Sequence, residues 1–344
     1  MTTAAVLAQM GSNNTTFRNR IINPGMVIDQ RNAGASVTAN DGTFVVDRFK
    51  YVMSQNSKGT SQQSTTAPSN YINSIQFTSS SAYTVGSSEY FLLTHSIEGY
   101  NIADLGWGTA AAQPVTLSFQ VRSSLTGTFG GAVENGTRFY PFSYTINAAN
   151  TWETKTITIA GDTSGTWLTG NGLGVRIRFS LGAGATVSGT AGSWGGTTYY
   201  SATGATSVVG TNGATFYITG VQLEAGTNAT PFEFRPYGTE LALCQRYFVN
   251  TTEAACMSNI NSRYLSVCTR LNPVPMRATP SVSVSGTYTF NPFFGSGLYT
   301  SSNAPYLQRN VNDNFIINFD MGASTGTSGF GEIYNATLSI SAEL

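Results

Sequence analysis

The sequence has a single histidine, His95, and only 10% of its 344 residues are charged. One histidine excludes zinc sites with several histidines and limits any Ser-His-Asp or Cys-His arrangement to that residue. His95 lies in 90–98, a segment with the pattern of a strand, so we predict a structural role for it. No catalytic residue and no cofactor are predicted.

Surplus charge of either sign is also missing. Lysine and arginine number 17, as do aspartate and glutamate, so the formal net charge is +0. Binding to nucleic acid or to an anionic membrane surface needs an excess of positive charge. No apolar run approaches the length of a membrane helix. We therefore predict neither a nucleic-acid partner nor membrane insertion.

Cysteine is scarce, and its spacing matches no metal site. Cys244, Cys256 and Cys268 are predicted to be free thiols, as in a chain that folds in a reducing cytoplasm. Residues 1–12 lack the basic and long apolar regions of a signal peptide. No Asp-rich loop is present to supply calcium ligands, so no metal is predicted.

Alternating apolar and polar residues dominate the rest of the chain. The clearest case is 115–122, and the same period of two recurs at 156–159, 175–179 and 216–218. The parity of the apolar positions changes at Gly220, which predicts a β-bulge. Many short strands separated by Gly, Asn and Ser turns predict an all-β fold, a jelly-roll β-sandwich.

The length of the chain predicts two domains. We expect an N-terminal arm at 1–18, the jelly roll at 19–237, a linker helix at 238–250 and a smaller C-terminal β-sandwich at 251–344. Thr239 is the expected N-cap of the helix. The helix is expected to place Leu241, Cys244 and Phe248 on one face.

Four aromatic residues are candidates for binding glycans, because exposed rings stack on the C–H surfaces of sugars. Trp194, Tyr199 and Tyr200 lie in a predicted long loop at 182–213, and Trp107 lies between two glycines. The alternative is that these rings pack the loop onto the sandwich or onto a neighbouring subunit, which is the commoner use of large aromatics.

Two further tryptophans, Trp152 and Trp167, lie beside strands and are predicted to belong to the core.

Several motifs together resemble a signature of bacteriophage structural proteins, often described as tail-fibre or carbohydrate-binding-like proteins. They are GVQLEAG at 220–226, ATPFE at 229–233, RPY at 235–237 and ELALCQRYF at 240–248. The start NRIINPGMVIDQR at 19–31, VDRF at 46–49, PMRATP at 275–280 and AEL at 342–344 are similar to other parts of that family. The resemblance implies a jelly roll like those of carbohydrate-binding modules, a smaller β-sandwich and a place on a virion.

Side chains in these motifs have structural interpretations. We expect Glu224 to cap or to pair with an arginine such as Arg235. Phe232 and Phe234 are expected to plug the end of the sandwich, and Arg246 to hold the helix between the domains.

The resemblance leads us to expect a non-enzymatic virion structural protein of the tail-fibre or receptor-binding type that contacts host surface glycans. Such proteins usually form homotrimers, so other copies of the chain are expected partners. Residues 1–18 are expected to contact other virion proteins. The chain would fold in the host cytoplasm and leave by lysis.

Two alternatives remain. One is a capsid decoration, head-fibre or adaptor protein with a purely structural role. The other is a glycan-degrading enzyme, which would need two acids at close range. The scattered acids of the first domain that could meet this need are Asp29, Asp47, Glu98, Asp104, Glu134, Glu153 and Asp162.

Overall fold

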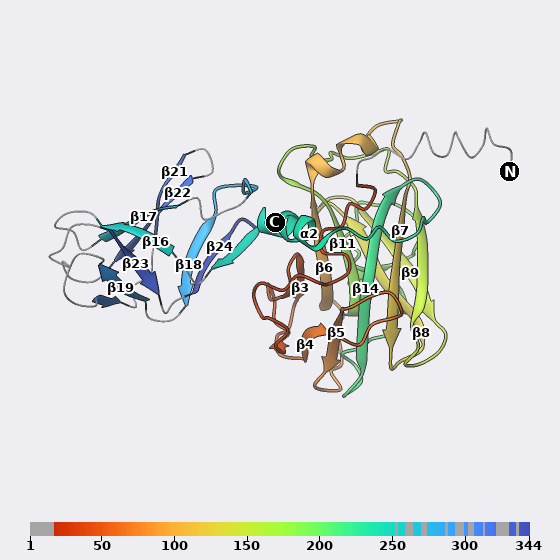
Figure 1. Ribbon diagram of the computed structural model, residues 1–344. Coiled ribbons are helices and arrows are strands. Elements are labelled where there is room, and N and C mark those ends of the chain that lie inside the picture. The colour runs from red at the N-terminus through yellow and green to blue at the C-terminus, as the bar shows by residue number, and fades with distance from the viewer. Residues whose placement is uncertain are drawn as a thin grey trace.

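Two β domains are joined by one short helix, α2 (Tyr237–Gln245), in the computed structural model (Figure 1). The structure describes residues 17–344 except 252–253, 259–263, 270–273, 286–287, 293–298, 302–305, 312–313, 321–329 and 335–336. The predicted fold is confirmed: a jelly-roll β-sandwich is followed by a smaller β-sandwich. The predicted arm at 1–18 lies outside the described residues up to position 16.

The jelly roll consists of two six-stranded antiparallel sheets. Sheet A contains, in spatial order, β1 (Val37–Thr38), β4 (Gly59–Ser64), β5 (Ser74–Ser79), β14 (Thr215–Ala225), β7 (Val115–Ser123) and β10 (Glu153–Ile159). Sheet B contains β2 (Phe44–Val46), β3 (Phe49–Met53), β6 (Tyr90–Glu98), β11 (Leu173–Ala183), β8 (Gly127–Glu134) and β9 (Phe139–Ile146). Short 3₁₀ helices η1 (Gly99–Asn101) and η2 (Ala103–Leu105) follow β6.

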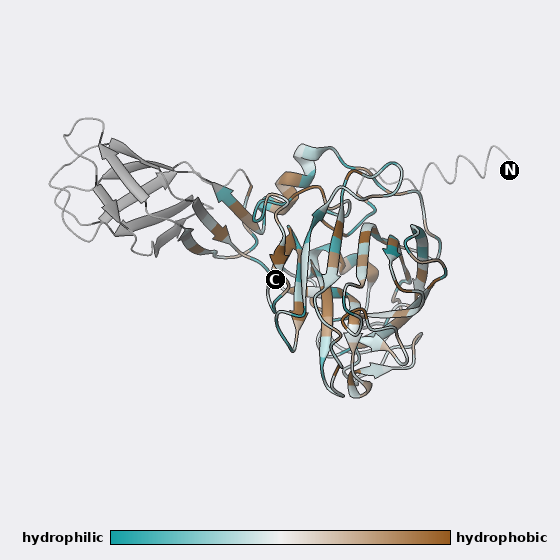
Figure 2. Ribbon diagram, turned by 90° about the horizontal axis from the view of Figure 1, so that it is seen from below, coloured by the Kyte–Doolittle hydropathy of each residue, from teal (hydrophilic) through white to brown (hydrophobic). Residues whose placement is uncertain are grey.

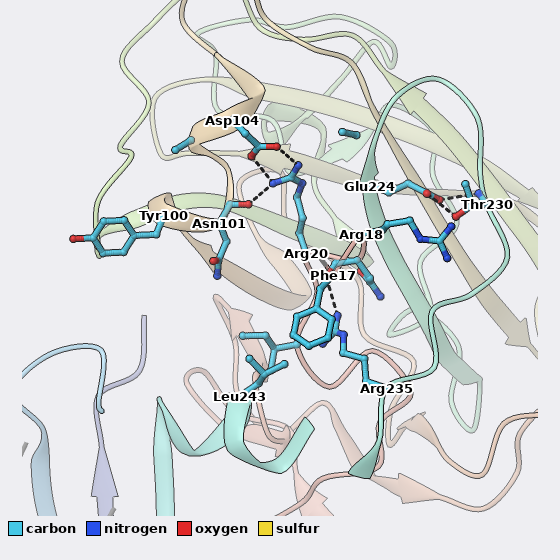
Figure 3. A pocket seen from close by; sticks show the side chains of 14 residues that line it. Phe17, Arg18, Arg20, Tyr100, Asn101, Asp104, Glu224, Thr230, Arg235 and Leu243 are labelled. Atoms are coloured by element: carbon cyan, nitrogen blue, oxygen red, sulfur yellow. Dashed lines mark hydrogen bonds and ion pairs between the residues drawn. The ribbon is translucent and has the colours of Figure 1, made fainter. Parts of the chain in front are cut away.

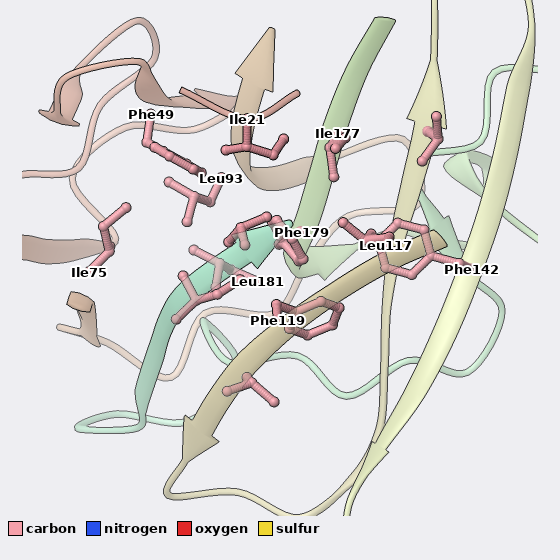
Figure 4. Close-up of a cluster of buried hydrophobic side chains, with 14 of the residues drawn as sticks. Ile21, Phe49, Ile75, Leu93, Leu117, Phe119, Phe142, Ile177, Phe179 and Leu181 are labelled. Carbon is pink, nitrogen blue, oxygen red and sulfur yellow. The ribbon is translucent and has the colours of Figure 1, made fainter. Parts of the chain in front are cut away.

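The core lies between the two sheets and is built from alternate residues of each strand. Val115, Leu117, Phe119 and Val121 of β7 are buried, as the sequence alternation predicts. Figure 4 shows Leu117 and Phe119 meeting Phe179 from the opposite sheet, and the rings of Phe119 and Phe179 lie 5.1 Å apart. Brown hydrophobic segments alternate with paler ones along these strands (Figure 2). The remaining residues of each strand must therefore face outward.

The predicted bulge at Gly220 is confirmed. The pairing of β14 with β7 changes register between Thr219 and Gln222, and Gly220 has a φ of 61°. A Cβ at this position would lie 2.7 Å from the ring of Tyr71. Only glycine accommodates both the left-handed backbone and this close approach.

The described residues of the second domain form a three-stranded and a seven-stranded sheet. The first contains β15 (Phe248–Thr251), β24 (Thr337–Ser341) and β18 (Ser281–Ser285). The second contains β20 (Tyr299–Ser301), β19 (Tyr288–Pro292), β23 (Phe330–Tyr334), β16 (Ala254–Ser258), β17 (Tyr264–Thr269), β22 (Asn314–Asp320) and β21 (Tyr306–Val311).

Of the three cysteines, Cys244 is a buried free thiol, as predicted. The side chains of Cys256 and Cys268 lie outside the described part of the chain.

The linker helix begins earlier and is shorter than the predicted segment 238–250. Its N-cap is Pro236, whose ψ of 141° is extended, and Thr239 lies inside the first turn. The helix ends at Gln245, and Phe248 already pairs with Ser341 in the sheet of the second domain. The predicted helix between the domains is confirmed, but its bounds differ because an extended proline precedes its first turn and sheet pairing follows its last one.

Charged side chains join the two domains. Arg246 pairs with the buried Glu98 of β6 at 3.1 Å, which confirms its predicted role at the junction. Glu343 near the described C-terminal end pairs with Arg31 at 3.0 Å and with Arg48. Arg277 donates to the carbonyl of Asn171 at 2.8 Å. Both ends of the second domain are therefore tied to sheet B and the loops beside it.

No helix among the described residues is long and apolar enough to cross a membrane.

The buried carboxyl of Asp47 gives the junction a pH dependence. Burial raises the pKa of Asp47 from 3.8 to about 6, against the opposing charge of Arg31. The proton on the Asp47 carboxyl stabilises the folded state, because the folded state binds this proton more tightly than the unfolded state does. This contribution to the free energy of unfolding is complete below pH 3.8 and is lost as the pH rises through 6. As the pH rises between those two values, the free energy of unfolding of the wild type should fall by roughly 3 kcal/mol more than that of the Asp47→Asn variant. Urea unfolding at a series of pH values measures the difference, and parallel curves would contradict the assignment.

Candidate functional site on the outer face of sheet A

The predicted aromatic candidates Trp107 and Trp194 lie in one packed cluster with Trp167. The three ring centroids are 4.7 to 5.4 Å apart. Trp107 is 6% exposed, and the indole of Trp194 donates to the carbonyl of Ala160 at 2.7 Å. Trp107 offers no open ring face, and the cluster fastens the long loop to the jelly roll.

Tyr199 and Tyr200 lie at a different place in the same loop. The Tyr200 ring lies 4.9 Å from Tyr90 and 4.7 Å from the guanidinium carbon of Arg178. A Cβ on Gly189 would lie 2.3 Å from the Tyr199 ring, so that ring rests on the glycine. The four predicted residues therefore share no common cleft.

The predicted loop at 182–213 covers part of the outer face of sheet B, at β8, β9 and β11, and leaves Ser143 and Thr145 of β9 exposed. It contains η3 (Ala185–Val187) and two short parallel strands, β12 (Ser188–Gly189) and β13 (Ser201–Ala202). Its backbone reaches β8, where the amide of Thr206 donates to the carbonyl of Thr128 at 2.7 Å. Arg178 points outward from β11 and is nevertheless buried.

The outer face of sheet A is different, because part of it is open. Gln62 of β4 is paired with Gln76 of β5, Gln76 with Tyr217 of β14, and Tyr217 with Arg122 of β7. These side chains face outward because their neighbours in each strand fill the core. We call this line of residues, together with Trp152, the cross-strand row.

Trp152 completes the row at the start of β10. Its ring is half-buried and lies 6.1 Å from the ring of Tyr217 in an edge-to-face arrangement. The guanidinium of Arg122 lies over the same tyrosine, 4.9 Å from its centroid, and its Nε donates to the carbonyl of Asn150 at 2.9 Å. The aromatic end of the row is thus held in place by contacts on the protein.

A second line of polar groups runs beside the row. Gln120 of β7 donates to the hydroxyl of Thr154 in β10 at 2.9 Å. The hydroxyl of Tyr71 also hydrogen bonds with Gln120, while burial raises the pKa of Tyr71. The open area therefore presents amides, hydroxyls and aromatic rings.

An exit segment, residues 226–235, covers the rest of this face. Gln222 and Glu224 point outward after the bulge but are buried beneath it. Glu224 accepts from the amide and hydroxyl of Thr230, at 2.8 and 2.7 Å. Of the two roles expected for Glu224, capping is observed and pairing with Arg235 is not, because the Arg235 guanidinium binds Glu240 at 3.1 Å instead.

Three rings, one from Tyr71 and two from the exit segment, form an aromatic wall at the border of the open area. Tyr71 lies 5.1 Å from Phe232 and 5.6 Å from Phe234, and the two phenylalanines are 4.7 Å apart. Phe234 is 62% exposed, so it does not plug the sandwich as predicted. A groove of 360 Å³ lies beside the wall and is also lined by Ile72 and Tyr237.

A second hollow of 860 Å³ lies near the described N-terminal end (Figure 3). The exposed rings of Phe17 and Tyr100 line it. Both Nη atoms of Arg20 donate to Asp104 at 2.7 Å, and this hydrogen bonding lowers the pKa of Asp104. The ion pair neutralises these two charges, and Arg18 adds a further cation to the aromatic and amide surface of the hollow.

The single histidine is part of the core. His95 is 1% exposed and lies 4.7 Å from the ring of Phe49. Burial lowers its pKa well below the ordinary value, so the imidazole is neutral. Its Nε2 accepts from the amide of Ile22 at 3.4 Å. The predicted structural role is confirmed.

Each scattered acid of the first domain is held by a specific partner. Asp29 accepts from two backbone amides, at 3.0 and 2.8 Å. The other six pair with a cation: Asp47 with Arg31, Glu98 with Arg246, Asp104 with Arg20, Glu134 with Arg178, Glu153 with Lys155 and Asp162 with Arg138. Within the described ranges, no three His, Cys, Asp or Glu side chains gather to hold a metal ion.

Sequence reasoning missed the central residues of the cross-strand row. Trp152 was expected in the core, but its half-buried ring lies on the outer face, whereas Trp167 is buried as predicted. The sequence did offer one signal: Tyr217 lies between the apolar residues Phe216 and Ile218 of one strand, so its side chain had to face outward. The residues that pair with Tyr217 could not be identified from the sequence, because they come from strands far apart in the chain.

Comparison with known proteins adds little to this picture. No protein-family model and no curated protein matches the chain. Among solved structures, a domain of bacteriophage CBA120 tailspike protein 4 is 12% identical with a TM-score of 0.31, over 61% of this chain and 22% of that chain.

Two bacterial proteins are similar to the same degree. A family 11 carbohydrate-binding module from Clostridium thermocellum is 11% identical with a TM-score of 0.30, over 56% of this chain and 98% of the module. A putative sugar-binding protein from Bacteroides thetaiotaomicron is 10% identical with a TM-score of 0.33, over 60% and 100%. Similarities this low establish no family relationship.

Replacing Trp107 and Trp152 by alanine tests whether each ring is packed in the interior or lies on the surface. Trp107→Ala removes a buried ring and should lower the free energy of unfolding by about 3–5 kcal/mol. Trp152→Ala removes a half-buried ring and should cost less than about 1.5 kcal/mol. Urea denaturation followed by circular dichroism compares the two. Equal losses would show that the Trp152 ring is as deeply packed as that of Trp107.

Proposed function

We propose that this chain is a non-catalytic bacteriophage virion protein of the tail-fibre or receptor-binding type, whose jelly roll binds host surface glycans. The observation that carries the proposal is the open part of sheet A, where the cross-strand row presents amides and a tryptophan ring. Amides can both donate to and accept from sugar hydroxyls, and an indole packs against sugar C–H groups.

The rest of the jelly roll supports a binding role. The core fixes the strands, and the strands fix the spacing of the row, so little side-chain order has to be gained on binding. The loop at 182–213 covers part of the outer face of sheet B, whereas the cross-strand row lies on the uncovered part of sheet A.

The arrangement of acids supports a non-catalytic role. A glycosidase needs one carboxyl group that can donate a proton and a second that acts as a base or nucleophile. In the jelly roll the seven scattered acids instead bind arginine, lysine or backbone amides.

The place on a virion rests on the motifs that resemble phage structural proteins and on the balanced charge. A surface with few charged groups has little charge to desolvate when it packs against other copies of the chain. In a homotrimer, three weak glycan sites would act together, and several fibres on one virion would strengthen attachment further.

A structural role as an adaptor or head-fibre protein is the second candidate. The aromatic wall and its groove favour it, because Ile72, Phe234 and Tyr237 are 74%, 62% and 64% exposed. Exposed apolar patches of this kind mark contacts between proteins.

A glycan array tests the first candidate. The wild-type chain should bind a subset of glycans, and Trp152→Ala should weaken that binding about tenfold, the effect of losing roughly 1.4 kcal/mol. Trp194→Phe, within the packed cluster, serves as the control and should bind like wild type. No binding by the wild-type chain to any glycan would contradict the proposal.

The assembly state tests the second candidate. If the groove holds copies of the chain together, Phe234→Ser should shift the mass measured by light scattering toward the monomer. The exposed Ser143→Ala on β9 should leave the mass unchanged. An assembly that is unaffected by Phe234→Ser would remove the groove from the contact.

A further inference from the structure

We infer that the ligand of sheet A is an uncharged, extended oligosaccharide that lies across the strands, along the row from Trp152 to Gln62. This inference rests on the proposed function and adds the ligand's charge, direction and length.

The charge follows from the composition of the open surface. The outward residues of sheet A outside the exit segment's cover are nearly all uncharged: Thr60, Gln62, Gln76, Thr78, Thr215, Tyr217, Ser118, Gln120, Thr154, Thr156 and Thr158. Arg122 is the one cation among them, and its guanidinium already contacts the Tyr217 ring and the Asn150 carbonyl. At every member of the row except Arg122, an acidic group of a sugar would lose solvation without gaining an ion pair.

The direction of the ligand follows from which paths over the sheet are blocked. A ligand that ran along β14 would meet the ring of Tyr71, which lies directly over Gly220. The adjacent outward residue of β14, Thr219, is fully buried and so is closed to a ligand. Across the strands, the row continues without a break from β10 through β7, β14 and β5 to β4. A chain crossing the strands therefore meets the whole row.

The length follows from the spacing of the strands. Five strands separated by about 4.8 Å give a row about 19 Å long. That distance exceeds the size of one sugar ring, so a single ring contacts only one or two members of the row. Affinity should consequently increase with the number of rings until the row is filled.

The two ends of the row have different roles. Trp152 supplies a ring surface at the β10 end, while Tyr217 is 8% exposed and contributes mainly its outer edge. At the other end, Gln62 makes no side-chain hydrogen bond to the described residues. Gln76 donates only a long bond of 3.3 Å to Thr78. Both amides are thus available to sugar hydroxyls.

Isothermal titration with oligosaccharides of one to six rings tests the inference. The probes are an uncharged series taken from the best ligand of the glycan array and a matched series bearing carboxylates. The affinity of wild type should rise with each ring and level off at about four, and the carboxylated series should bind at least about tenfold more weakly.

Variants locate the ligand on the row. The double variant Gln62→Ala/Gln76→Ala should bind the four-ring oligosaccharide about tenfold more weakly than wild type. Its affinity for the two-ring oligosaccharide should be unchanged if that ligand occupies the Trp152 end of the row. Ser143→Ala on sheet B is the matched control. Urea midpoints equal to wild type show that each variant is folded.

The outcomes separate the two levels of the proposal. If glycans bind but the glutamine variant is unaffected, or acidic chains bind best, the inference is overturned and the proposed function stands. If no glycan binds at all, the proposed function itself fails.

Discussion

Pairing of buried polar groups where the chain enters and leaves the jelly roll is the constraint on which the rest depends. Arg235, almost fully buried, donates to the carbonyls of Asn19 and Ile21 at 2.7 and 2.8 Å and pairs with Glu240 of α2. The same Glu240 carboxylate accepts from the amide of Asn23. Leaving any of these groups unpaired would cost about 1–3 kcal/mol or more. One network therefore fixes the entering segment at 19–23, the exit segment and the helix that leads to the second domain.

This network also decides which surface is available. By holding the exit segment against β14, it covers Gln222 and Glu224 and leaves the other half of the sheet open. Arg235 and Glu240 of this network belong to the phage-like motifs at 220–248, and Asn19, Ile21 and Asn23 belong to the motif at 19–31. Their direct role is thus architectural, and the surface proposed to bind glycans lies beside them.

The alternation of residues was enough to predict the strands, because each inward residue of β7 had to be apolar for the core to form. It also located the bulge, since only a change of parity keeps Val221 in the core after Gly220. The cross-strand row could not be predicted in the same way. Gln76, Tyr217 and Arg122 are far apart in sequence, and they meet only through the register of three non-consecutive strands. Whether a ring such as Trp152 is buried depends on the same register.

The positions of the tryptophans have an optical consequence. All four lie in the jelly roll between positions 107 and 194, and the C-terminal domain has none. Intrinsic tryptophan emission is therefore a reporter for one domain of the chain. Three of the four indoles are in mutual contact, so their signal should change when the packed cluster opens. Trp152 stands apart from them on the outer face, where its emission responds to the solvent and to whatever covers the sheet.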